Sequence, residues 1–250
     1  MPETILECDG VTRYFGALAA VNNLSFGVER GQLFGIAGPN GAGKTTLFNL
    51  LSGHVPASSG VITFQGQPIQ TFPPHRICHL GLARTFQIPQ VFGSGTIEEN
   101  VLVGAYFGRR SGWPGLSFDR ATRQRVARAL EVTGLTAKRR APAQTATIFD
   151  KKRLMIASAL ATEPELLMLD EPFGGLNHGE IDDLIALIQQ LHATGLTILL
   201  IEHVMRALML LSQRVLIMHH GEKLAEGTPD EIRRNPRVVQ VYLGREASVA

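Results

Sequence analysis

The feature that most constrains how this chain can fold is a glycine-rich stretch at residues 38–46, with the sequence GPNGAGKTT. It fits the pattern G-x-x-x-x-G-K-[S/T] and lies between an apolar run, 33–38, and a segment with helical character, 43–53. Glycines are needed there because backbone N–H groups must come close to phosphate oxygens. The complete motif in this context argues against a chance glycine turn. We therefore predict a strand, a phosphate-binding loop and a helix, in that order.

Separate roles follow for the residues of this loop. The start of the helix adds a partial positive charge that favours phosphate. Lys44 is expected to reach the terminal phosphates, and the hydroxyl of Thr45 is expected to bind Mg²⁺. The residues predicted to contact the nucleotide are Gly38, Pro39, Asn40, Gly41, Ala42, Gly43, Lys44, Thr45 and Thr46.

A second motif, LLMLDE at residues 166–171, is an apolar strand that ends in two carboxylates. We expect Asp170 to hold Mg²⁺, directly or through water, as strand-end aspartates do in phosphate-loop enzymes. Glu171 is expected to polarise the attacking water as a general base. The alternative is an acid pair that only caps a helix after the strand. The phosphate loop in the same chain favours the first interpretation.

Two further polar residues are candidates for the same site. His203 follows an apolar run, 197–202, and we expect it to point at the γ-phosphate and help to place the water. Lone histidines are nevertheless more often structural than catalytic. Gln87 ends the stretch RTFQ, and its amide oxygen suits Mg²⁺ or water. From spacing alone, Gln87 is no better a candidate than any surface residue.

Composition places limits on the class of protein. A chain of 250 residues, 44% of them hydrophobic, can bury a sizeable core as one large domain or as a domain with a subdomain. Cys8 and Cys78 are far apart and form no metal-binding spacing, which favours a reducing compartment. The first residues show no secretory leader, and no apolar run approaches the ~18 residues of a membrane span. We expect a chain that does not cross a membrane by itself.

Charge is unevenly distributed along the chain. Residues 105–155 hold twelve Lys and Arg against three Asp and Glu, although the whole chain has a net charge of only +2. One interpretation is a solvated basic face. The other is a surface that faces an anionic partner such as the inner leaflet of a membrane.

Hydrophobic periodicity predicts the order of the elements. Alternating apolar residues over 24–29 and apolar runs at 61–64 and 68–70 predict strands near the N-terminus. Glycine, serine and proline over 93–117 mark a break, and a helical pattern begins at Arg120. After Met155 strands and helices alternate, which favours parallel strands covered by helices. The predicted elements are strands at 166–169, 197–201 and 214–218 and helices at 181–192 and 203–212.

These motifs, in this order, resemble the nucleotide-binding subunits of ABC transporters over nearly the whole chain. In that family an aromatic residue stacks on adenine, and Phe15 lies at this place. The family's motifs correspond to the Walker A loop at 38–46, the Q-loop glutamine Gln87, the Walker B strand at 166–171, the D-loop at 174–177 and the H-loop histidine His203. The resemblance implies ATP and Mg²⁺ as ligands, with Glu171, His203 and Gln87 as catalytic residues and Thr45, Gln87 and Asp170 on the metal.

More narrowly, the chain resembles the ATPases of branched-chain amino-acid importers. The supporting pieces are RTFQ followed by TIEENVLVGA, the insert after it, IEHVM, EGTPDEI and VVQVYLG. Lipopolysaccharide-export ATPases share the final YLG but fit the RTFQ stretch and insert less well. The resemblance implies uptake of branched-chain amino acids or a related small polar solute; urea, amides and lipopolysaccharide export are the alternatives.

The fold implied is α/β, a P-loop NTPase (RecA-like) core of the ABC ATPase type. An N-terminal antiparallel β-subdomain and a helical subdomain complete it. We expect one ABC ATPase domain over 1–250, with the core and β-subdomain at 1–87 and 156–235, the helical subdomain at 88–155 and a C-terminal tail at 236–250.

The partners implied are a second ABC ATPase subunit, two transmembrane permeases and a periplasmic solute-binding protein that acts through the permeases. The place implied is the cytoplasmic face of the inner membrane, as a peripheral subunit. No nucleic-acid partner is expected, because the chain has room for neither a second ATPase domain nor a long coiled-coil insert. The segment FQIPQVF at 86–92 is either a dock for a permease helix or ordinary core packing.

One motif departs from the family pattern. The signature, LSGGQ or a close variant, falls at residues 146–150 and reads ATIFD. Ile148 and Phe149 replace the glycines, so close backbone approach to the partner's γ-phosphate is expected to be blocked. Asp150 is expected to carry a negative charge toward that anion. Ser158 replaces an arginine usual in the next helix, and Asn177 replaces the D-loop aspartate.

Two hypotheses follow from this departure. In the first, the chain forms an asymmetric heterodimer: its Walker motifs and His203 work with an intact signature on a different subunit, and ATIFD makes a weak or silent site. In the second, the chain is a regulatory subunit that binds ATP and hydrolyses little. The carboxylate Glu171 and His203 favour the first hypothesis.

Overall fold

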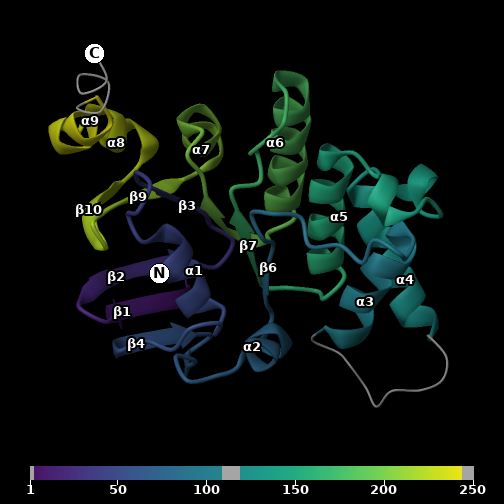
Figure 1. Cartoon of the computed structure of the whole chain (residues 1–250), viewed down its shortest axis with the longest axis horizontal. Coiled ribbons are helices and arrows are strands. Elements are labelled where there is room, and N and C mark those ends of the chain that lie inside the picture. The colour runs from purple at the N-terminus through teal and green to yellow at the C-terminus, as the bar shows by residue number, and fades with distance from the viewer. Residues whose placement is uncertain (1–2, 109–118, 244–250) are drawn as a thin grey trace. The chain divides into compact units, whose positions relative to one another are not determined.

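The computed structural model describes residues 3–108 and 119–243. The chain divides into two compact units, one formed by residues 1–74 and 197–250 and the other by residues 75–196 (Figure 1). In the sequence, the second unit is therefore inserted between the two segments of the first. Arg109, Arg110 and the part of the predicted tail beyond residue 243 lie outside the described residues.

The first unit begins with an antiparallel sheet in which the strand order is β2-β1-β4-β5. Its strands are β1 (Thr4–Phe15), β2 (Leu18–Glu29), β4 (Ser59–Phe64) and β5 (Gln67–Pro68). Leu24, Phe26 and Val28 are buried, whereas the residues between them are partly exposed, as the alternating pattern predicts. The predicted N-terminal antiparallel β-structure is confirmed.

A second sheet in the same unit carries the phosphate loop. Its strands are β3 (Leu33–Ala37), β8 (Thr197–Ile201), β9 (Arg214–His219) and β10 (Glu222–Gly227). β3 lies between β8 and β9 and runs parallel to both, and β10 pairs with β9 in the antiparallel sense. Every residue of β3 and β8 is buried, which is why these strands are continuous apolar runs. The rings of Phe26 and Phe34 stack at 5.6 Å and join the two sheets.

The helices of this unit are α1 (Lys44–Leu51), α7 (Met205–Leu211), α8 (Pro229–Arg234) and α9 (Pro236–Leu243). The packing of α7 on β3 depends on Gly35. A Cβ atom at Gly35 would lie 2.4 Å from the hydroxyl of Ser212 and 2.8 Å from a methyl carbon of Leu208. The strand that leads to the phosphate loop is thus held close to its covering helix.

The second unit combines a pair of parallel strands with five helices in its described part. The strands are β6 (Leu82–Arg84) and β7 (Leu166–Asp170). The helices are α2 (Pro74–Leu80), α3 (Ile97–Phe107), α4 (Arg120–Val132), α5 (Ile148–Leu160) and α6 (His178–Ala193). Across residues 3–108 and 119–243, no helix has both the length and the apolar character needed to cross a membrane.

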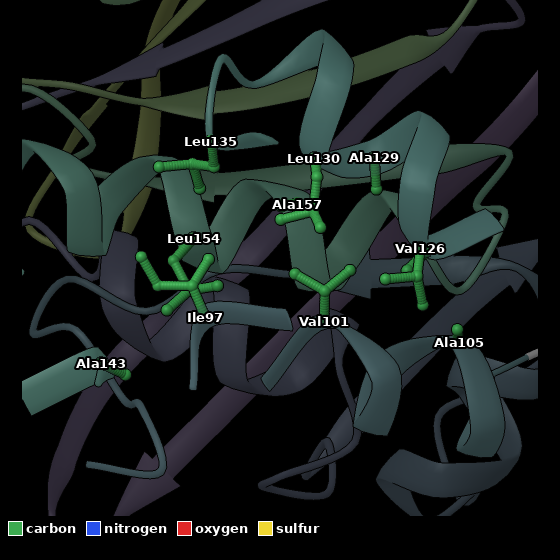
Figure 2. Close-up of a cluster of buried hydrophobic side chains, with 11 residues drawn as sticks. Ile97, Val101, Ala105, Val126, Ala129, Leu130, Leu135, Ala143, Leu154 and Ala157 are labelled. Carbon is green, nitrogen blue, oxygen red and sulfur yellow. The ribbon is translucent and has the colours of Figure 1, made fainter. Parts of the chain in front are cut away.

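Helices α3, α4 and α5 share one apolar core (Figure 2). The buried residues of this cluster are Ile97, Val101, Ala105, Val126, Ala129, Leu130, Leu135, Ala143, Leu154, Ala157 and Ala161. α3 and α5 are in close contact at Gly104, where a Cβ atom would lie only 2.2 Å from the carbonyl oxygen of Ser158. The absence of a side chain at Gly104 is what allows this contact.

The predicted strands and helices are found in the expected order, and the structure adds elements that were not predicted, among them α2, β6 and β10. Two segments differ from the interpretation of their sequence. β5 ends at Pro68, whereas the apolar run had predicted a strand at 68–70. α3 lies within the stretch that had been interpreted as a break. Thr96 and Glu99 form a capping box at its start, and this T-x-x-E pattern is visible in the sequence. The boundaries of the helical subdomain at 88 and 155 stay a prediction.

Candidate functional site

The phosphate loop connects β3 to α1 and is shaped by two glycines. A Cβ atom at Gly38 would lie 2.3 Å from the carbonyl oxygen of Met218, and one at Gly43 would lie 2.3 Å from that of Ala20. Gly43 also has a φ of 98°, which disfavours any other residue. Lys44 is buried, and its Nζ donates to the carbonyl oxygens of Gly38 (2.7 Å) and Pro39 (3.1 Å). The loop therefore holds its ammonium group against its own backbone.

Residues around the loop offer further contacts for a nucleotide. Thr45 is exposed at the first turn of α1. Phe15, at the end of β1, is 47% exposed and has the guanidinium of Arg13 stacked 4.7 Å from its ring centroid. A cavity of about 220 Å³ borders the loop. It is lined by Pro39, Asn40, Gly41, Ala42, His219, His220 and Val241, of which the last three were not among the predicted site residues.

In the second unit, Asp170 lies at the end of β7, as the motif predicts. Its side chain is 4% exposed and forms an ion pair with Arg84, whose side chain is 6% exposed. Nη2 of Arg84 donates to Oδ2 of Asp170 over 2.8 Å. Sequence reasoning missed this partner, because the pairing of β6 with β7 is what brings the two side chains together.

Glu171 follows Asp170 in a left-handed conformation, with a φ of 45°. Nε2 of Gln87 donates to Oε2 of Glu171 over 2.7 Å, so the structure brings two of the predicted catalytic residues into contact. The ammonium of Lys152, a buried residue on α5, donates to the carbonyl oxygen of Glu171 over 3.1 Å. The side chain and the backbone of Glu171 are thus held from two different elements.

Three residues of the segment 84–87 bind β7 or the residue that follows it. Arg84 binds the carboxylate of Asp170, and the N–H of Thr85 donates to the carbonyl oxygen of Met168 over 2.9 Å. The N–H of Asp170 lies 3.4 Å from the hydroxyl of Thr85. Because Gln87 then binds Glu171, each of the two carboxylates has one partner from this short segment.

His203 belongs to the first unit, with the phosphate loop and Phe15. It follows β8 as expected, and its imidazole is 55% exposed. Nδ1 of His203 lies 3.8 Å from Oε2 of Glu202. The buried carboxylate of Glu202 accepts hydrogen bonds from the N–H groups of His203 and Val204, both at 2.9 Å. Glu202 therefore fixes the backbone on which the histidine stands.

The signature residues begin α5, and one expectation about them is wrong. Thr147 is the N-cap, and its hydroxyl accepts from the N–H of Asp150. Asp150 is buried instead of facing an anion, and it pairs with Lys138 (2.6 Å) and with Arg153. Burial by itself raises the pKa of Asp150, but the hydrogen bonds and charges of Lys138 and Arg153 outweigh it and lower the pKa below its ordinary value. Its charge is compensated within the unit.

The other departures from the family pattern have visible structural roles. Ile148 is 55% exposed, and Phe149 packs under the guanidinium of Arg153 at 4.4 Å. Ser158 lies where α3 approaches α5, and its hydroxyl donates to the carbonyl oxygen of Asn100 over 3.4 Å. Asn177 forms a capping box with Glu180 at the start of α6, a role that its side-chain oxygen fills as well as an aspartate.

The donors present fit the groups that the motifs imply. At Gly38 and Gly43 there is no room for a side chain, so only backbone lines the loop there. Lys44 is a buried cation at the start of a helix. Both features suit phosphate. The oxygen atoms of Thr45, Asp170 and Gln87 are hard donors of the kind that Mg²⁺ prefers. Together these features define a phosphate-loop ATPase.

Comparison with known proteins gives the family. The model of the ABC transporter family matches residues 21–174, and that of the branched-chain amino acid ATP-binding cassette transporters matches residues 222–248. The chain belongs to the ABC transporter family, in which it is an ATP-binding subunit and an ATPase. The prediction from the motifs is confirmed, as are the α/β phosphate-loop fold and the binding of nucleotide.

Individual relatives match over nearly their whole length. The high-affinity branched-chain amino acid transport ATP-binding protein BraF of Pseudomonas aeruginosa is 42% identical, over 98% of this chain and 99% of its own. LivG of Escherichia coli, which carries the same description, is 40% identical over 98% and 99%. The ADP conformation of MJ1267, an ATP-binding cassette of an ABC transporter, superposes with a TM-score of 0.87 at 29% identity, over 96% of this chain and 99% of that one.

Proposed function

We propose that this chain is the ATP-hydrolysing subunit of an importer for branched-chain amino acids. The observation that carries the proposal is the likeness to BraF and LivG, which are named for that transport and match the chain from end to end. The C-terminal match to branched-chain transporters supports the same solute from a separate part of the chain. A related small polar solute, such as urea or an amide, is the alternative.

The site residues divide the work of hydrolysis between them. Residues 38–46 bind the phosphates of ATP, and Phe15 stacks on the adenine. Asp170, Thr45 and Gln87 would hold Mg²⁺, which would supply positive charge at the phosphates when bound. Glu171 accepts the proton of the attacking water, and His203 orients that water at the γ-phosphate. The hydrogen bond from Gln87 to Glu171 supports a shared site for these two residues.

The chain works with permeases in the membrane, and we propose residues 86–92 as the place where a permease helix docks. Phe86, Ile88 and Phe92 are exposed, Ile88 by 71%, which supports docking, whereas Val91 of the same segment packs against the core of α3, α4 and α5. Docking there would place the chain at the cytoplasmic face of the inner membrane. A periplasmic solute-binding protein would act on it through the permeases.

We further propose that the working dimer pairs this chain with a different ATPase subunit. Side chains at Ile148 and Phe149 occupy positions where the family signature has glycine, and Ile148 is exposed at the start of α5. Because Asp150 is buried and paired with Lys138 and Arg153, its charge does not repel the partner's nucleotide. The side chains of Ile148 and Phe149 are the obstruction that remains. The second candidate, a regulatory subunit with little hydrolysis, rests on the same two residues.

The test is the ATPase rate of the chain alone and mixed with the ATPase subunit encoded beside it. We expect activity only in the mixture, and we expect Glu171→Gln to reduce it by about a hundredfold or more, because the general base is lost. Uptake of labelled leucine by cells that carry the variant should fall in parallel. Uptake that follows urea instead would assign the other solute.

Two outcomes would contradict parts of this proposal. Robust, cooperative hydrolysis by the chain alone would refute the heterodimer. A mixture that stays active with Glu171→Gln would make this chain the regulatory half. Glu180→Gln is a matched control. Glu180 lies in the same unit, and its carboxylate also accepts a hydrogen bond, from the N–H of Asn177 at the start of α6. This variant should leave the ATPase rate unchanged.

A further inference from the structure

Arg84 is buried against the carboxylate proposed to hold Mg²⁺. The side chains of Arg84 and Asp170 are 6% and 4% exposed, and the hydrogen bond between them is 2.8 Å long. They come from adjacent parallel strands, β6 and β7, in a register that pairs Arg84 with Met168. The sheet therefore fixes the guanidinium beside the carboxylate.

The charges of this pair bear directly on metal binding. A buried carboxylate is costly unless a cation compensates it, so Arg84 stabilises Asp170 when no metal is bound. Mg²⁺ prefers carboxylate oxygen. Two cations that share one carboxylate repel each other, and the repulsion is strong where little water separates them. The same arginine that stabilises the metal-free carboxylate thus opposes the arrival of Mg²⁺.

The arginine also leads into the segment that contacts the second carboxylate. Its Cζ lies 5.0 Å from the ring centroid of Phe86, an exposed residue. The next residue, Gln87, donates to Glu171. If the guanidinium moved away from Asp170, the ring of Phe86 would have to move with it, and the position of Gln87 would change next.

We propose that Arg84 is a positioning residue that neutralises Asp170 in the metal-free state and competes electrostatically with Mg²⁺, which couples metal binding to the segment 84–87. The proposal rests on the proposed function, in which Asp170 is a magnesium ligand. It has two consequences. Magnesium binds more weakly than it would to an uncompensated carboxylate, and the segment 84–87 changes its solvent exposure when the metal binds.

The first consequence is tested with Arg84→Gln. MgCl2 is titrated into the full-length chain saturated with ADP, and the heat of binding is measured. The variant should bind Mg²⁺ about fivefold more tightly or better, because the competing charge is gone. ADP binding in EDTA, which needs no metal, should keep its Kd and shows that the variant is folded. An unchanged or weaker Mg²⁺ affinity overturns the proposal.

Arg153→Gln is the matched control. Arg153 also pairs with a buried aspartate, Asp150, and also stacks on a phenylalanine ring, Phe149, in the same unit. Its removal should leave the Mg²⁺ affinity unchanged, and an equal gain in this variant would overturn a specific role for Arg84. Arg84→Lys keeps the charge and should give a smaller gain. Should Arg84→Gln fail to fold, the uncharged variant Arg84→Met decides, and no gain in Mg²⁺ affinity there overturns the proposal.

The second consequence is tested by hydrogen exchange of the backbone over residues 84–92. In the ADP-bound wild-type chain, Mg²⁺ should raise exchange in this segment, and in Arg84→Gln the change should be absent. Equal changes in both proteins would overturn the coupling. Asp170→Asn distinguishes the proposed function from the proposal for Arg84. If Mg²⁺ bound to this variant and raised its exchange as in the wild type, Asp170 would not be a magnesium ligand, whatever the behaviour of Arg84.

Discussion

At the scale of single residues, Asp150 shows that the neighbours of a charged side chain decide whether its charge acts on a ligand or stabilises the fold. The sequence places it at the last position of the signature, where a negative charge would oppose a phosphate. The structure buries it between Lys138 and Arg153, on the inner side of the first turn of α5. Its role is to hold this turn to the chain around Lys138.

We predict that Asp150→Asn lowers the free energy of unfolding by ~1–3 kcal/mol at pH 7, since hydrogen bonds to charged groups contribute about that much. The folded pKa of Asp150 is lowered, so its contribution is present above the unfolded pKa and is lost as pH falls through the folded one. The difference between wild type and variant should shrink below about pH 4. Urea unfolding at several pH values measures it.

Asp183→Asn is the control, because Asp183 is an exposed carboxylate on α6. Its effect on unfolding should stay within about 0.5 kcal/mol at every pH. A difference for Asp150→Asn that is equally large at pH 3 and pH 7 would show that the ionised carboxylate contributes nothing beyond its shape.

At the scale of elements, the contact between α3 and α5 depends on one missing side chain. We predict that Gly104→Ala destabilises the protein by ~1–3 kcal/mol, because the new Cβ would overlap the carbonyl oxygen of Ser158 and force the helices apart. Alanine's higher helix propensity offsets part of this loss. Thermal unfolding measures the change.

Gly93→Ala provides the comparison, since a Cβ there would meet only the Cβ of Gln144, at an ordinary 3.5 Å. It should change the unfolding free energy by less than about 0.5 kcal/mol. If Gly104→Ala were as harmless as Gly93→Ala, the two helices would be able to separate without loss, and the missing side chain at Gly104 would not explain their packing.

The elements also show what the sequence could predict of the fold. Strands with alternating burial, such as 24–29, and fully buried strands, such as 197–201, follow directly from hydrophobic periodicity. α3 was missed because glycine, serine and proline on both sides outweighed the capping box at Thr96 and Glu99. β5 was overestimated because Ile69, though apolar and buried, lies after the strand.

The sequence predicted those site residues whose positions are determined by their neighbours in the sequence. The phosphate loop and the carboxylates Asp170 and Glu171 follow from local sequence, because the strand and the turn that place them are local. Arg84 could not be found this way. Its partner lies on another strand, and only the pairing of β6 with β7 brings the two charges together.

At the scale of the whole molecule, the proposed heterodimer rests on the side chains that stand in the signature. We predict that Ile148→Gly combined with Phe149→Gly raises the ATPase rate of the chain alone by about tenfold or more, because backbone N–H donors to a developing charge are worth at least that much. Steady-state phosphate release measures it. No gain would mean that something other than these side chains limits the chain alone.

Asp150→Gln tests the competing explanation, that the acidic residue silences the site. We expect no gain in rate, because Asp150 is buried and paired with Lys138 and Arg153. A rise in rate with this variant, and none with the glycine pair, would return the explanation to charge.

The order of strands in the first unit has a consequence for how the protein is made. β3, which carries the phosphate loop, has β8 and β9 as its two neighbours, and these begin only at Thr197 and Arg214. On the ribosome, the loop emerges early but has no sheet to belong to until nearly the whole chain has been synthesised. A prematurely terminated product therefore has the motif and cannot build the site. Competence to bind ATP thus marks a finished subunit.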